Sequence, residues 1–118
     1  MTKLEIGVGD VRKAAAEFVK TVRALEKGAR VRTREQLFFA DMPTLLKTLT
    51  SERWRLVEHL KRHGPLSINA LAQQLGRNYK NVHGDVKRLM DIGLVERLED
   101  CRIHIPFSSI VAELKMAA

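Results

Sequence analysis

The sequence contains one cysteine, three prolines and few aromatic side chains, with one tryptophan and one tyrosine among its 118 residues. A single cysteine excludes a disulfide within the chain and is typical of a protein from a reducing compartment. No run approaches the roughly 18 apolar residues that a membrane-spanning helix requires. The first ten residues also lack the apolar core and the cleavage signature of a signal peptide. These absences predict a cytoplasmic protein.

The motifs of common enzyme classes are missing as well. The chain has no glycine-rich phosphate loop, and its four histidines are scattered. Cys101 has only His104 nearby, on the expected opposite face of a strand, so we expect a small packing residue in a hairpin, with a redox sensor as the alternative. His59 and His63 have a spacing that could hold zinc, but no third ligand lies close in sequence. We therefore expect no enzyme, no cofactor and no metal.

Positive charge exceeds negative charge clearly. Lysine and arginine number 21 against 14 acidic residues, which gives a net charge of +7 and an isoelectric point near 10.0. The excess is concentrated between Arg53 and Arg88, where Glu58 and Asp85 are the only acidic residues. Such a charge favours a polyanionic partner. A membrane surface is disfavoured, because the helices lack a one-sided Trp/Phe/Leu face opposite a strongly cationic one.

Residues 67–93 organise the chain, because two short helical patterns meet there at a glycine-centred turn. Ser67 is expected to cap a helix over 67–75, and Gly76 to end it in a left-handed conformation. Asn78 is expected to cap a second helix over 78–92, which Gly93 ends. Apolar residues lie on one face of each helix: Ile68, Leu71, Ala72 and Leu75 in the first, and Val82, Val86, Leu89 and Met90 in the second. This pattern predicts a helix-turn-helix.

The polar side of the second helix is the candidate binding face. At about 100° per residue, Lys80, Gly84 and Lys87 lie opposite the apolar stripe. Asn81 and Arg88 lie on one flank and His83 on the other. An ordinary solvated surface is the alternative.

Gly84 in this face costs about 1 kcal/mol of helix stability compared with alanine, because it stands in an exposed helix interior. Close approach to a sugar-phosphate chain or a base edge would explain it, and neutral drift is the competing explanation.

Residues 1–49 form a predicted N-terminal extension. Lys3–Val8 alternates as a strand does, and residues 36–40 suggest a second, weaker strand. Between them, 29–34 could be a linker, a strand or a basic arm, and 42–49 is expected to be a short helix with Leu45, Leu46 and Leu49 inward. A helix is expected over 10–27. Its apolar residues, spaced by 4, 3, 4 and 3 positions, are Val11, Ala15, Phe18, Val22 and Leu25. This stripe either packs on the same chain or forms a dimer interface.

The remaining patterns complete a domain over 50–106 and a separate segment over 107–118. A helix is expected over 52–63, with Trp54, Val57 and Leu60 inward, and a hairpin over 94–98 and 101–105 with Ile103 and Ile105 inward. Its acidic residues Glu96, Glu99 and Asp100 would be repelled by phosphates, which leaves Arg97, Arg102 or His104 for any contact with DNA. A final helix is expected over 107–116, with Ile110, Val111 and Leu114 inward. The predicted fold class is mainly α with a small β-hairpin wing (α+β).

A helix, a helix-turn-helix and a hairpin in this order resemble a winged helix-turn-helix. The stretch GPLSINALAQQLGRNYKNVHGDVKRLMDIGLVER, residues 64–97, is similar to the winged-helix modules of MarR-like and ArsR-like prokaryotic transcriptional regulators. The resemblance covers about residues 50–106. It implies a sequence-specific regulator of double-stranded DNA, usually a homodimer and here expected to be a repressor. Its second helix enters the major groove through Tyr79, Lys80, Asn81, His83 and Lys87.

Two further points follow from the resemblance. Gly84 stands where these regulators often carry a larger side chain. The stretch more closely resembles a group of small predicted regulators that carry the sequence Tyr-Lys-Asn-Val-His, here residues 79–83. Some proteins of that group look like the antitoxins of toxin–antitoxin pairs. The alternative function is therefore an antitoxin or protein-interaction module that binds a toxin or another protein through the N-terminal extension.

Within the DNA-binding hypothesis the side chains have distinct roles. Lys80 and Lys87 donate to guanine edges or phosphates, and Asn81 pairs with adenine. Arg77, Arg88 and Arg102 fix the register on the sugar-phosphate backbone. The full predicted contact set is Ser67, Arg77, Asn78, Tyr79, Lys80, Asn81, His83, Gly84, Lys87, Arg88 and Arg102.

Overall fold

The computed structural model describes residues 2–9 and 34–113. The predicted helix over 10–27, with its stripe of Val11, Ala15, Phe18, Val22 and Leu25, lies outside the described residues. So do most of the 29–34 segment and the last five residues. Within the described part of the chain, no helix is both long and apolar enough to cross a membrane.

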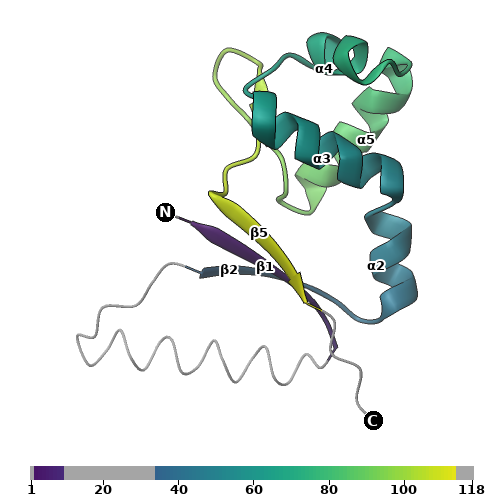
Figure 1. The fold of residues 1–118 in the computed structure, drawn as a ribbon, viewed down its shortest axis with the longest axis vertical. Coiled ribbons are helices and arrows are strands. Elements are labelled where there is room, and N and C mark those ends of the chain that lie inside the picture. Colours follow the sequence, from purple (N-terminus) through teal and green to yellow (C-terminus); the bar gives the residue numbers. More distant parts are fainter. Residues whose placement is uncertain (1, 10–33, 114–118) are drawn as a thin grey trace, which may run out of the picture. The chain divides into compact units, whose positions relative to one another are not determined.

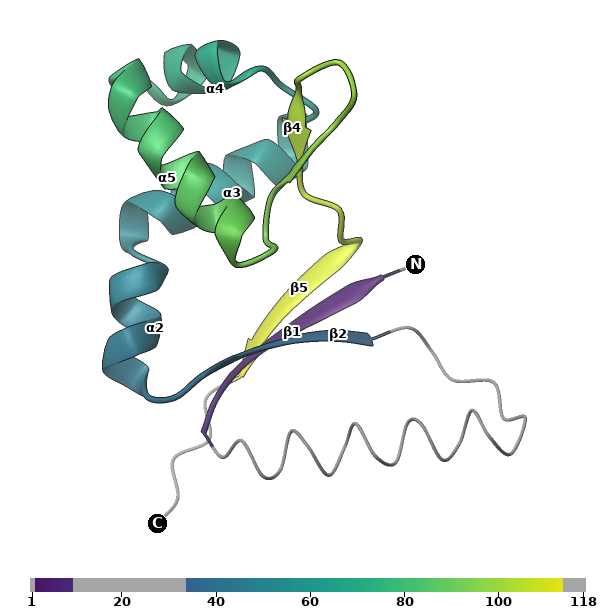
Figure 2. The ribbon, with the colours of Figure 1, turned by 180° about the vertical axis from the view of Figure 1, so that it is seen from behind.

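The chain forms an α+β structure with two compact units. One unit combines residues 1–46 with 107–118, and the other consists of residues 47–106. A three-stranded sheet belongs to the first unit, and three helices with a short hairpin belong to the second (Figures 1 and 2). The boundary falls inside helix α2, Met42–Thr48.

The sheet consists of parallel strands in the order β2-β1-β5, with bounds Arg34–Phe39, Lys3–Val8 and Ser109–Glu113. The predicted strand Lys3–Val8 is confirmed, and β2 confirms a strand where residues 36–40 suggested one. Register pairs Ile6 with Leu37 and with Ala112, so these side chains share one face of the sheet. Strand β1 is the central strand, and its side chains Leu4 and Ile6 are buried on that face.

The prediction of a helix over 107–116 is wrong where the structure describes it. Residues Ser109–Glu113 are strand β5, paired with β1 along its whole length. The backbone N–H and the hydroxyl of Ser108 both donate to the carbonyl oxygen of Thr2, at 2.8 and 2.7 Å. These hydrogen bonds lie at the start of the pairing between β5 and β1. Five residues are too few for their apolar spacing to distinguish a helix from a strand. The β-branched pair Ile110–Val111 favours a strand once the edge of β1 is available as a partner.

Helix α2 begins as the sequence predicts and packs differently. The carboxylate of Asp41 accepts from the hydroxyl and the backbone N–H of Thr44, at 2.6 and 2.8 Å, and these hydrogen bonds lower the pKa of Asp41. Leu49, just after the helix, is buried as predicted. The inward placement of Leu46 is wrong, because its side chain is 56% exposed. Leu45 and Leu49 are four residues apart and share a face, and Leu46 lies about 100° from Leu45 and about 60° from Leu49 around the helix axis.

Three capped helices build the second unit: α3 (Ser51–His63), α4 (Ile68–Leu75) and α5 (Tyr79–Asp91). The side chains of Thr50, Ser67 and Asn78 accept from a backbone N–H in the first turn of their helices, at 3.3, 3.0 and 2.8 Å. These hydrogen bonds satisfy donors that have no partner within the helix. The predicted caps Ser67 and Asn78 are confirmed.

The core of this unit is formed largely by the predicted apolar faces, to which Leu56 of α3 adds a fully buried side chain that was not predicted. Trp54 and Ile68 are only partly buried, and Ile105 in the hairpin is half-buried. The buried side chains of the unit are Leu49, Leu56, Val57, Leu60, Leu71, Ala72, Val82, Val86, Leu89, Leu94, Val95 and Ile103.

Gly76 ends α4 and starts the turn to α5. Its φ of 66° and ψ of 31° are left-handed, as predicted, and a side chain would be strained there. The backbone N–H of Arg77 donates to the carbonyl of Ala72 at 3.0 Å. Since Asn78 already caps α5, the two helices are separated by a turn of three residues, 76–78.

The hairpin pairs β3 (Glu96–Arg97) with β4 (Ile103–His104), which are shorter than the predicted strands. Leu66 adds an antiparallel bridge to Ile103, so three segments meet there. The prediction that Cys101 packs inside the hairpin is wrong. Cys101 is exposed, with a φ of 70°, because it lies in the turn between the strands rather than within one.

We predict that Gly64→Ala destabilises the protein. The φ of Gly64 is ordinary, at −73°, but an added Cβ would lie 2.5 Å from the carbonyl oxygen of Leu60, which accepts the Gly64 N–H. Relieving this overlap requires a backbone shift and is expected to cost about 1–3 kcal/mol. Urea denaturation of the two proteins measures the difference. An unchanged or higher midpoint would contradict the steric explanation.

Candidate nucleic-acid interface

The exposed side of α5 carries the polar residues that the sequence places there. Lys80, Asn81, His83, Gly84, Lys87 and Arg88 are all exposed. Val82, Val86 and Leu89 on the other side are buried to 1% exposure or less. The predicted division of this helix into a polar and an apolar side is confirmed. The result is a helix surface whose long side chains are predominantly cationic.

The first turn of α5 adds an aromatic pair to this surface. Tyr79 is half-exposed, and its ring centroid lies 5.9 Å from that of His83, one turn further on. The rings are tilted by 39°, within the range of favourable aromatic contacts. Tyr79 and His83 therefore present a broad amphipathic surface beside Lys80 at the start of the helix.

Gly84 lies in open space in the middle of the same surface. No heavy atom beyond its neighbours lies within 4 Å of the place where a Cβ would be. Its helical backbone also needs no glycine. The packing of the described residues therefore gives no reason for the missing side chain.

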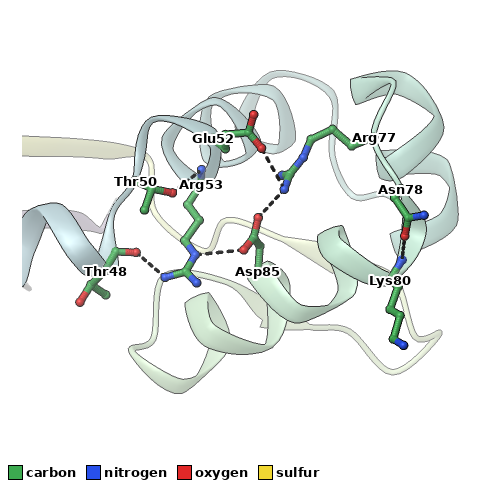
Figure 3. A network of polar contacts seen from close by, with 8 residues as sticks. All are labelled: Thr48, Thr50, Glu52, Arg53, Arg77, Asn78, Lys80 and Asp85. Carbon is green, nitrogen blue, oxygen red and sulfur yellow. Dashed lines mark hydrogen bonds and ion pairs between the residues drawn. The ribbon is translucent and has the colours of Figure 1, made fainter.

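Three segments are held together beneath this surface by one carboxylate. Asp85 of α5 accepts from Arg53 Nε of α3 at 3.0 Å and from Arg77 Nη2, in the turn, at 2.8 Å (Figure 3). Arg53 Nη1 also donates to the carbonyl of Thr48 at 2.9 Å, and Arg77 also pairs with Glu52 at 3.1 Å. The side chains of Arg53, Arg77 and Asp85 are only 16–21% exposed.

This network changes the part that two predicted charges play. Arg77 was predicted to contact phosphates, whereas in the structure its guanidinium pairs with Asp85 and Glu52. Asp85 was counted only as one acidic residue among many basic ones. No local pattern could have identified it, because its partner Arg53 lies 32 positions earlier. Lys80, in contrast, points away from the network (Figure 3).

In the hairpin, Arg102 is paired with a carboxylate, and the exposed acidic residues outnumber the exposed unpaired cation, Arg97. Arg102 donates from its backbone N–H and its Nε to Asp100, at 3.1 and 2.6 Å. These hydrogen bonds, the backbone one first, lower the pKa of Asp100, so the turn keeps its negative charge at neutral pH. Glu96, Arg97 and Glu99 are exposed beside it. The Arg102 guanidinium, a predicted phosphate contact, is thus already paired.

The remaining singled-out side chains have structural positions. Ser67 and Asn78 use their side-chain oxygens as helix caps. His59 and His63 lie with ring centroids 4.4 Å apart, and His59 Nε2 lies 2.7 Å from Gln74 Oε1 of α4, a hydrogen bond between α3 and α4. Within residues 2–9 and 34–113, no group of three or more His, Cys, Asp or Glu side chains could hold a metal ion.

Comparison with known proteins places the chain in a family. The model of the HVO_A0114 family matches residues 48–112, more than half of the chain, so the chain belongs to the HVO_A0114 family. The match includes α3, α4, α5 and the hairpin, together with most of β5. Neither the curated proteins nor the solved structures contain a significant match to this chain.

We predict that Asp85→Asn destabilises the protein by about 1–3 kcal/mol, because hydrogen bonds to charged groups in partly buried places contribute that much. An amide offers one oxygen where two arginines need acceptors. Glu52→Gln is the matched control: Glu52 also pairs with Arg77 but is 63% exposed, so we expect a change below about 1 kcal/mol. Urea denaturation measures the loss of unfolding free energy in each variant. Equal losses would show that Asp85 is no more important to the network than Glu52.

Proposed function

We propose that the protein is a sequence-specific, double-stranded DNA-binding transcriptional regulator that acts as a homodimeric repressor. The observation that carries this proposal is the exposed side of α5, which is cationic, bare at Gly84, and placed directly after a three-residue turn. The order of α3, α4, α5 and the β3–β4 hairpin supports a winged helix-turn-helix arrangement. The role is one of binding rather than catalysis.

In this proposal α5 enters the major groove, which at about 12 Å wide admits an α-helix. Lys80 and Lys87 donate to guanine or phosphate oxygens, and Asn81 can form two hydrogen bonds with adenine. Tyr79 and His83 contact the groove wall at the start of the helix. Gly84 lets the helix backbone approach the DNA more closely than any side chain would allow.

Contacts to the sugar-phosphate backbone are assigned differently from the sequence-based hypothesis. Arg88 is exposed at the last turn of α5 and remains the proposed phosphate contact. Arg77 acts indirectly, by fixing α5 through Asp85. Arg102 is paired with Asp100, so Arg97 is the better candidate for any contact from the hairpin. Binding should weaken as salt rises, because neutralised phosphates release counterions.

We predict that Lys80→Ala and Asn81→Ala each reduce discrimination between operator and random DNA by about 1–3 kcal/mol, as loss of a base contact does. Arg88→Ala should weaken binding to all sequences alike, because phosphates carry no sequence information. Fluorescence anisotropy titrations with both duplexes measure these differences. Equal losses on operator and random DNA for Lys80→Ala and Asn81→Ala would contradict the base contacts.

Gly84→Ala should affect folding and binding in opposite directions. Alanine is favoured over glycine in a helix by about 0.8–1.0 kcal/mol, so the unfolding midpoint should rise. Within residues 2–9 and 34–113, nothing obstructs the new methyl group. If α5 approaches DNA at this point, affinity for the operator falls. A stabilised variant with unchanged affinity would show that Gly84 is not at the DNA contact.

A second candidate function is an antitoxin or protein-interaction module, and the acidic hairpin favours it. Glu96, Glu99 and Asp100 repel phosphates, and Asp100 holds Arg102. Mobility-shift assays with the upstream DNA of the gene, at two salt concentrations, separate the functions. Specific DNA-binding proteins reach about 10⁻⁸ M or tighter. No shift below micromolar protein at moderate salt would favour the interaction module.

A further inference from the structure

Strand β5 forms one edge of the parallel sheet. It pairs with β1 on one side, and among the described residues no strand pairs with its other side. Backbone N–H and C=O groups along such an edge can pair with a strand of another molecule. The second edge of the sheet is β2.

The two edges differ in sequence. Strand β2 begins Arg-Glu-Gln, and charged residues on an edge discourage pairing with another chain. Strand β5 reads Ser-Ile-Val-Ala-Glu, with three consecutive apolar residues and no lysine or proline. The side chain of Val111 is 40% exposed, one of the few large apolar side chains so placed in the described chain. Both edge strands expose one large apolar side chain to 40%, Phe38 in β2 and Val111 in β5, and β5 differs in having a single charged residue, Glu113, at its end.

We propose that β5 pairs antiparallel with β5 of a second copy of this chain, with Val111 on the two-fold axis. The two three-stranded sheets then join into one continuous sheet. A strand that pairs with its own copy makes an isologous interface, which closes as a dimer.

The charges of β5 fit this register. With Val111 facing Val111 of the partner subunit, Ser109 faces Glu113 and Ile110 faces Ala112 across the axis, and all five residues are paired. No like charges stand opposite one another. Ile110 and Ala112 share the sheet face on which Leu4 and Ile6 are buried, so their pairing extends an apolar layer. A register centred on Glu113 would instead oppose two carboxylates.

This dimer is independent of the proposed DNA binding, although it would supply the second copy that a symmetric operator requires. It also differs from a dimer through the stripe of residues 11–25. Both distinctions can be tested in the absence of DNA.

Cysteine cross-linking of the full chain tests the interface. In a Cys101→Ser background, Val111→Cys places two thiols on residues whose Cα atoms are about 4.5–5.5 Å apart in an antiparallel pair. That separation allows a disulfide. We expect mild oxidation with glutathione disulfide to give a covalent dimer in nonreducing electrophoresis, at micromolar protein, and dithiothreitol to reverse it.

Ser109→Cys in the same background is the matched control. Its partner thiol would be displaced by four residues, about 13 Å along the strand, so little cross-linking is expected. Absence of the Val111→Cys dimer, or equal cross-linking of the two variants, would overturn the proposal. A dimer by light scattering that Val111→Cys does not cross-link would assign the contact to another surface.

A charge substitution gives a second, independent measurement. Val111→Lys places two like charges at the axis, and we expect the dimer dissociation constant to rise at least tenfold. Glu35→Lys, on the opposite edge strand, should leave it unchanged. Circular dichroism spectra are the control that tests whether both variants are folded. If Val111→Lys is folded and still dimeric, the proposed interface is wrong, and mobility shifts of the unmodified protein decide the DNA-binding proposal separately.

Discussion

The carboxylate of Asp85 accepts hydrogen bonds from Arg53 of α3 and from Arg77 in the turn before α5, and the orientation of α5 depends on these contacts. Apolar packing holds the inner side of α5 in place but is not directional. The two charge-assisted hydrogen bonds are directional, and they add specific geometry to that packing. Gly76 makes the arrangement possible, because its left-handed conformation brings Arg77 back toward the start of α3.

The same network determines which charges remain available to a partner. Arg53 and Arg77 are paired with Asp85, Arg77 also with Glu52, and Arg102 with Asp100. The positive charge that the proposal assigns to DNA is therefore carried by the exposed Lys80, Lys87 and Arg88 of a single helix. An ion pair within the chain both positions a surface and removes charge from it. A count of basic residues along the sequence therefore overstates the cationic surface.

The parallel sheet joins segments that are distant in the sequence. It brings β1 and β5, which lie more than a hundred residues apart, into direct pairing. Among the described residues it also leaves β5 as an edge strand with three consecutive apolar residues. If a second copy pairs with this edge, the element that closes the chain on itself also produces the dimer that a symmetric DNA site requires.

The sequence by itself determined the features that depend on neighbours in the chain. Caps at Ser67 and Asn78, the left-handed Gly76 and the two sides of α5 follow from hydrogen bonds and side-chain spacing within a few residues. Tertiary structure decided the rest. Ser109–Glu113 became a strand because β1 offered it an edge, and Arg53 of α3 found its acceptor in Asp85, 32 residues further along the chain. Such partners are set by distances in space, which a local pattern of residues does not contain.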